Sequence, residues 1–127
     1  MSAEPADDSH PLAVTAATFE QEVLARSARE PVLVDFWAAW CAPCRSLAPV
    51  LDRLAAAYAG RATIAKVDTD AEPELATRYG VRSLPTLAVF RHGKVVDAVI
   101  GAQPESALRS VLDAHVERAS DRERAAA

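Results

Sequence analysis

The chain has 127 residues, of which half are hydrophobic and a quarter charged, as is ordinary for one globular domain with short terminal extensions. Its 14 Lys and Arg and 18 Asp and Glu residues leave a net charge of −4 and are mixed along the chain, so nucleic acids and anionic membranes are poor partners. No run approaches the roughly 20 apolar residues that a membrane span requires.

Both ends of the chain are predicted to lie outside the folded domain. Residues 1–10 are mostly acidic or polar and predict a flexible arm, residues 11–118 the domain, and residues 119–127 a tail that frays. The arm has neither the basic region nor the apolar region of a secretory signal, so the expected location is the cytoplasm.

Strands and helices alternate in the first half of the chain. We predict a short strand over 12–14 and a helix over 18–26. The apolar, β-branched run over 31–38 is typical of a central strand buried on both faces. A helix over 41–58 follows, because its apolar residues recur at helical spacing: Leu47, Val50, Leu51, Leu54 and Tyr58.

The second half continues the alternation and ends with a hairpin and a helix. We predict a strand over 62–67, a short helix over 72–79, strands over 86–90 and 95–100 with Gly93 in the turn, and a helix from Pro104. Alternating elements imply parallel crossovers, whereas the hairpin adds antiparallel strands. The predicted fold is α/β, with a central mixed sheet of about five strands and four helices on both faces.

Cys41 and Cys44 carry the chemistry. They lie where the buried strand meets a helix, three residues apart on one helical face, close enough for a disulfide. Unpaired N–H groups at the helix start favour a thiolate. We predict that the more exposed Cys41 is the nucleophile and that Cys44 resolves the mixed disulfide.

Two other interpretations of the cysteines are weaker. Inert packing cysteines would have no reason to lie at the start of a helix. A structural zinc ion needs four ligands, and the sequence has no second cysteine pair, so no metal is expected.

Asp35 is an acid in the middle of the predicted buried strand. Desolvation should raise its pKa and allow it to exchange protons near neutral pH. The alternative is a buried ion pair without a catalytic role.

The segment Val34-Asp-Phe-Trp-Ala-Ala-Trp-Cys-Ala-Pro-Cys-Arg45 closely resembles the active-site segment of thioredoxins. The segments Ala65-Lys-Val-Asp68 and Val81-Arg-Ser-Leu-Pro-Thr-Leu87 also resemble that family, as do the positions of Gly93 and Gly101. The resemblance runs from about residue 12 to 116. It implies the thioredoxin fold and a protein-disulfide reductase, for which a monomer is the default expectation. Electrons would come from NADPH through a separate thioredoxin reductase, with no cofactor bound to this chain, and the other partners would be disulfide-containing client proteins.

The resemblance also implies roles for single residues. Asp35 would help to deprotonate Cys44 through water, with Lys66 as its partner. Pro85 would be a cis proline facing the cysteines, with the backbone of Leu84 free to pair with a substrate segment. A flat apolar surface around Cys41 would bind the substrate: Trp40, Ala42, Pro43, Leu84, Ile100 and Gly101. Trp37 is expected in the core.

The chain departs from the commonest family pattern at a few positions, and two other functions remain open. Ala42 stands where glycine is usual, and Arg45 where lysine is usual. Disulfide oxidases and isomerases of the same fold often carry histidine between the cysteines, whereas this pair encloses Ala-Pro. A thioredoxin-fold binding module or holdase would keep its function without either cysteine.

Overall fold

Five strands form one mixed sheet in the computed structural model, which describes residues 9–126 and the side chains of residues 9–116. They are β1 (Leu12–Ala13), β2 (Val32–Trp37), β3 (Thr63–Asp68), β4 (Thr86–Arg91) and β5 (Lys94–Ile100), in the order β1-β3-β2-β4-β5. β3 is parallel to β1 and β2, whereas β4 is antiparallel to β2 and β5. The predicted mixed sheet is confirmed.

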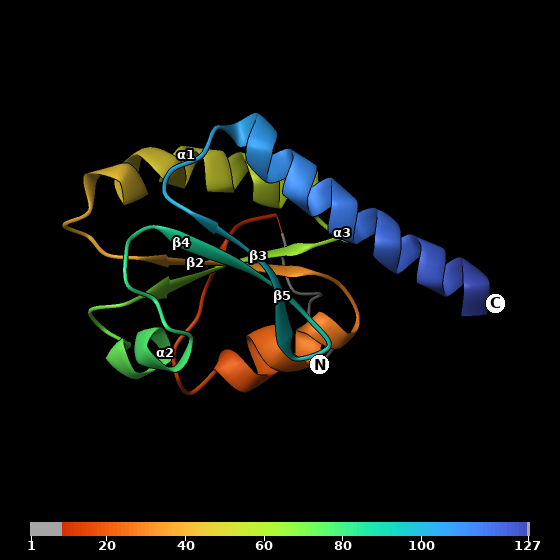
Figure 1. Cartoon of the computed structure of the whole chain (residues 1–127), viewed down its shortest axis with the longest axis horizontal. Coiled ribbons are helices and arrows are strands. Elements are labelled where there is room, and N and C mark those ends of the chain that lie inside the picture. Colours follow the sequence, from red (N-terminus) through yellow and green to blue (C-terminus); the bar gives the residue numbers. More distant parts are fainter. Residues whose placement is uncertain (1–8, 127) are drawn as a thin grey trace, which may run out of the picture.

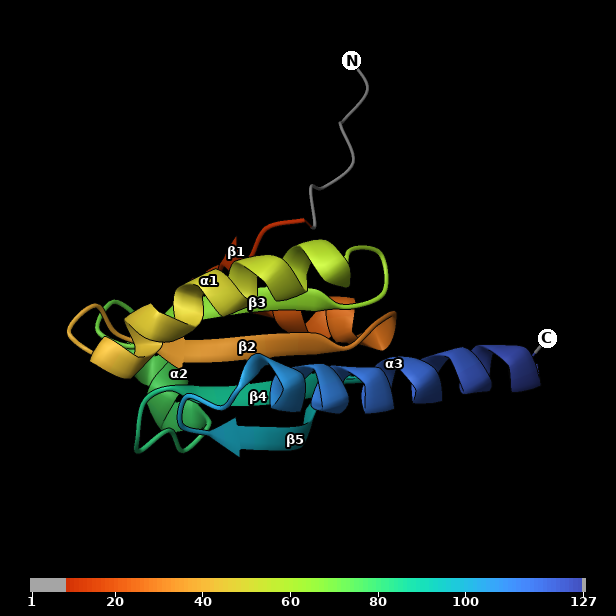
Figure 2. The same ribbon diagram turned by 90° about the horizontal axis from the view of Figure 1, so that it is seen from above.

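Helices cover both faces of this sheet, as Figures 1 and 2 show. The helices α1 (Ala42–Ala57) and α3 (Glu105–Ala126) lie on one face. The other face carries α2 (Pro73–Arg78) and a helical segment made of η1 (Glu20–Ala25) and η2 (Arg26–Ala28). That segment begins and ends two residues later than the sequence predicts. Its later start follows from a turn over residues 16–18, next to which Thr18 Oγ1 accepts the Thr15 N–H at 3.0 Å.

The sheet separates two apolar cores. On the α1 and α3 face the core includes Leu33, Leu47, Leu51, Ile64, Leu87, Leu108 and Leu112. On the other face it includes Phe19, Val23, Val34, Phe36, Val67 and Phe90. β2 contributes to both cores because it is central, which explains why its sequence is apolar except for Asp35.

The connections and the last helix add three details. A two-residue turn joins β4 to β5, with His92 and Gly93 at φ 53° and 77°, the positive values that such hairpin turns require. The backbone of α3 stays helical to Ala126, beyond the position where the sequence predicts fraying; alanine, glutamate and arginine in this segment favour helix. In the described part of the chain, no helix has the length and apolar character to cross a membrane.

Candidate active site

The two cysteines stand at the start of α1, just after the carboxyl end of β2. β2 ends at Trp37 and α1 begins at Ala42, with Cys41 as the N-cap residue. Cys41 and Cys44 form a disulfide with their Cα atoms 5.3 Å apart, within the usual range for such bonds. The structure joins the two cysteines in the way that the sequence predicts.

The first turn of α1 directs a backbone donor at the sulfur of Cys41. The Cys44 N–H donates to Cys41 Sγ at 3.3 Å. Pro43 precedes Cys44 in this turn, where a helix needs no N–H group. A helix N-terminus stabilises a nearby anion by about 0.3–1 kcal/mol. The turn therefore favours a thiolate at Cys41 once the disulfide is reduced.

Both cysteines are buried in the disulfide form. Cys41 is 4% exposed and Cys44 3%, so the predicted greater exposure of Cys41 is only marginal here. Both cysteines are buried because they pack with Ala38 and because Trp37 and Leu84 lie against them. What distinguishes Cys41 is its place at the helix start, next to the exposed Trp40.

The loop before β4 completes the site. The Leu84–Pro85 peptide bond is cis, as the resemblance implies. Leu84 packs against the cysteines, and the Gly101 N–H donates to the Pro85 carbonyl oxygen at 2.8 Å. The end of β5 is thereby held beside the residues that contact the disulfide.

Apolar residues are exposed around the disulfide. Trp40 is 68% and Ile100 63% exposed, and a contiguous exposed apolar patch is typical of an interaction site. Ala42 and Pro43 are also exposed, whereas Leu84 and Gly101 are half-buried. We call these six residues the docking surface: Trp40, Ala42, Pro43, Leu84, Ile100 and Gly101.

Asp35 is a buried acid beneath α1. It is 1% exposed, and neither carboxyl oxygen has a hydrogen-bond partner among the described residues. Desolvation raises the pKa of Asp35 to about 7, against the opposing effect of the Lys66 charge. Because side chains alternate along a strand, Asp35 shares the sheet face of Leu33, which packs in the same core as the α1 residues. The predicted proton-exchanging acid therefore lies on the same side of the sheet as Cys44.

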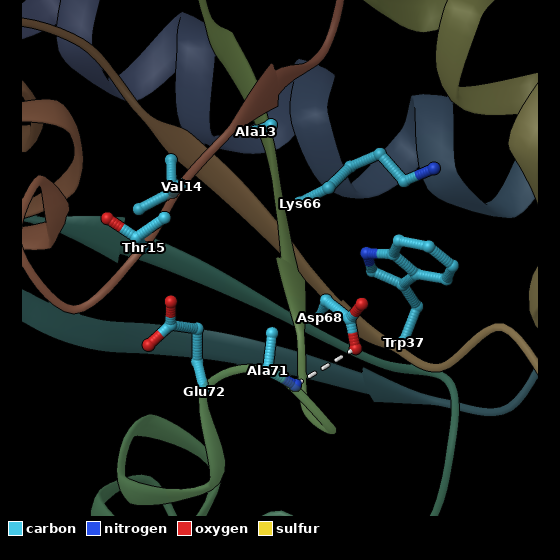
Figure 3. Close-up of a pocket in the computed structure, with 8 residues that line it drawn as sticks. All are labelled: Ala13, Val14, Thr15, Trp37, Lys66, Asp68, Ala71 and Glu72. Atoms are coloured by element: carbon cyan, nitrogen blue, oxygen red, sulfur yellow. Dashed lines mark hydrogen bonds between the residues drawn. The ribbon is translucent and has the colours of Figure 1, made fainter.

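Lys66 is a neighbour of Asp35 rather than its hydrogen-bond partner. The two residues are in register on β3 and β2, yet the Lys66 ammonium lies over the Trp37 ring, 4.6 Å from its centroid (Figure 3). The sequence predicts Trp37 in the core, but the structure shows it half-buried. The reason is that Trp37 ends β2 and lines a hollow of about 260 Å³ with Lys66 and Asp68 (Figure 3).

Comparison with known proteins places this site in a family. A family model described as Thioredoxin matches residues 10–114. The chain belongs to the thioredoxin family. It is 53% identical over 104 residues to Thioredoxin 1 of Synechococcus elongatus, covering 82% of this chain and 95% of that one. It is 48% identical over 93 residues to the chloroplastic M-type thioredoxin of Zea mays, covering 73% and 56%.

A solved thioredoxin has the same fold. The N21Q mutant thioredoxin from Halobacterium salinarum NRC-1 superposes with a TM-score of 0.77 at 39% identity, covering 89% of this chain and 96% of that one. Thioredoxins are thiol–disulfide oxidoreductases, and this member of the family has its cysteine pair at disulfide distance. Together these findings support protein-disulfide reductase activity.

The structure also adds contacts that the sequence does not predict. Arg45 Nη1 donates to the Ala39 carbonyl oxygen at 2.7 Å, which fixes the peptide just before Trp40. Ala38 packs against both cysteines. Neither contact follows from periodicity, since each depends on how the loop after β2 folds back onto α1. Among the described residues, no cluster of three or more His, Cys, Asp or Glu side chains is suited to hold a metal ion.

Proposed function

We propose that this protein reduces client disulfides in two exchange steps. In the first step, the Cys41 thiolate attacks one sulfur of the client disulfide. A bond forms between Cys41 and that sulfur, the client S–S bond breaks, and the other client sulfur leaves as a thiolate. The contact between the Cys44 N–H and Cys41 Sγ, together with the helix start, supports Cys41 as the attacking group.

In the second step, Cys44 resolves the mixed disulfide. Its thiol proton passes to the Asp35 carboxylate through water, and the Cys44 thiolate attacks Cys41 Sγ. The Cys41–Cys44 disulfide forms, and the second client sulfur leaves as a thiolate. Two electrons have then moved from the cysteine pair to the client, and the pair has reached the state seen in the structure.

The observation that carries this proposal is the disulfide at a helix start, surrounded by exposed apolar residues. An exposed apolar surface of this kind suits an extended protein segment. Leu84 precedes β4, and this position supports strand addition between its backbone and such a segment. The raised pKa of Asp35 supports its part in proton transfer near neutral pH.

The proposed cycle needs an electron source outside this chain. Thioredoxins in general act on disulfide-containing substrates and are reduced by thioredoxin reductase. We infer the same partner here, with NADPH as the electron donor of the reductase and no cofactor bound to this chain. We further propose that the protein acts as a monomer in the cytoplasm.

The test is to trap the mixed disulfide. Cys44→Ser should form a covalent adduct with a disulfide protein such as insulin, which a small thiol then releases. Cys41→Ser is the matched control and should form no adduct, although it removes one sulfur in the same way. Both variants should stop NADPH consumption in a coupled assay with thioredoxin reductase and insulin.

Other outcomes would favour the alternative functions. If only Cys41→Ser formed adducts, the assignment of nucleophile and resolving cysteine would be reversed. If neither variant formed an adduct and a holdase assay gave full activity with both, the chain would be a binding module.

A further inference from the structure

A hollow of about 240 Å³ lies beside the docking surface. Its walls come from the loops on either side of α2, from α2 itself and from the loop before α1: Trp40, Thr69, Ala76, Val81, Arg82 and Leu84. Trp40 and Leu84 belong to both the hollow and the docking surface, and Leu84 also packs against the cysteines. A client segment at Cys41 therefore has this hollow within reach.

The volume of the hollow suits one side chain. Small-molecule sites usually measure roughly 300–1,000 Å³, and this hollow is smaller. Four of its six lining residues are apolar or aromatic, so the aliphatic part of a client side chain has a surface on which to pack.

Arg82 gives the hollow its charge. The other five lining residues are uncharged, and the Arg82 side chain is exposed. The ion pairs shown for the described side chains involve other cations: Arg26, Arg53, Arg109 and His115. The Thr69 hydroxyl already donates to the Trp37 carbonyl oxygen at 3.1 Å. A carboxylate entering the hollow would therefore meet a guanidinium without a competing acid in the lining.

The two acids at the end of β3 and just after it form no ion pair with Arg82 among the described side chains. Asp68 and Asp70 do not line the hollow. Asp68 Oδ1 instead accepts the Asp70 and Ala71 N–H groups at 3.0 and 3.4 Å.

We propose that this hollow receives a client side chain close to the attacked cysteine and that Arg82 selects an acidic residue there. This inference rests on the proposed disulfide-reductase function and names a class of preferred client. Clients with Asp or Glu at one particular position within two residues of the reactive cysteine are reduced faster than clients with a neutral or basic residue at that position.

The test uses peptide disulfides that differ at one position. Each peptide carries Asp, Asn or Lys at one of the four positions within two residues of its cysteine, and the second-order rate constant of reduction is measured for each. At one of these positions, Asp should react about two- to fivefold faster than Asn, and Lys more slowly than Asn, as expected for an exposed charge pair. The difference should shrink as salt is added.

Two substitutions assign the preference to Arg82. Arg82→Glu should reverse the order of the Asp and Lys peptides, and Arg82→Gln should abolish it. Lys94→Glu is the matched control, because it changes the net charge equally but lies at the opposite end of β5 from Ile100. This variant should keep the wild-type order.

The outcomes separate this inference from the function on which it rests. Equal rates for all peptides, or an order that persists in Arg82→Glu, would overturn the role of Arg82 and leave the reductase function standing. A loss of the order in Lys94→Glu would assign it to net charge instead. Failure to reduce any peptide would contradict the proposed function itself.

Discussion

Replacing Asp35 by asparagine should remove a pH-dependent loss of stability. Below pH 3.8 the carboxyl is protonated in both the folded and the unfolded chain. Between pH 3.8 and about 7 it ionises only in the unfolded chain, because burial raises its pKa in the fold. The unfolded chain then binds fewer protons, so the stability of the wild type falls as the pH rises through this window.

The size of the effect follows from the shift. A rise of about three pKa units, at 1.36 kcal/mol per unit, corresponds to about 4 kcal/mol. The asparagine of the variant does not ionise, so its own cost in the core is independent of pH. The free energy of unfolding of Asp35→Asn minus that of the wild type should therefore grow by about 4 kcal/mol between pH 4 and 8 and then level off.

Urea denaturation of the disulfide form at several pH values measures this difference. Asp52→Asn is the matched control, because it makes the same change at an exposed position on α1. Its difference from the wild type should show no comparable rise. A difference for Asp35→Asn that stays flat between pH 4 and 8 would refute the assignment of Asp35 as a desolvated acid.

Three further substitutions test the docking surface and the packing. Trp40→Ala should lower kcat/KM for protein disulfides about tenfold with little loss of stability, because the ring is 68% exposed; unchanged turnover in the coupled assay would remove Trp40 from the docking surface. Leu51→Ala should cost about 2–5 kcal/mol in urea denaturation, because Leu51 is fully buried, and a smaller loss would indicate a core that collapses around the site. Tyr58→Phe should cost about 1 kcal/mol by losing the hydroxyl bond to Asp113; an unchanged midpoint would show that this bond contributes nothing.

Local sequence patterns predict most of the fold. The apolar run of β2 and the helical spacing of Leu47, Leu51 and Leu54 each predict an element whose burial the structure confirms. The position of the cysteine pair can be predicted for the same reason, since the junction of a buried strand and a helix is a local feature of the sequence. The special role of Asp35 can also be predicted, because burying an acid inside an apolar run is costly.

Contacts between segments that are distant in the sequence are harder to predict. Lys66 lies over the half-buried Trp37 ring at the end of β2, and no spacing in the sequence predicts this contact. The hollow at Arg82 needs several segments that meet only in the fold. The near-equal burial of Cys41 and Cys44 likewise depends on Leu84, which lies far away along the chain.

The most direct test of the central claim is a redox titration of the Cys41–Cys44 pair. The protein is equilibrated in thiol–disulfide buffers of graded potential, and the fluorescence emission of Trp37 and Trp40 is followed. Trp37 packs against the cysteines and Trp40 precedes Cys41 in the sequence, so oxidation of the pair should change the emission. A disulfide reductase predicts a midpoint at the reducing end of the scale, near the roughly −270 mV known for thioredoxin. A midpoint near the roughly −120 mV of the strongly oxidising periplasmic disulfide oxidase would contradict the reductase function and favour an oxidase.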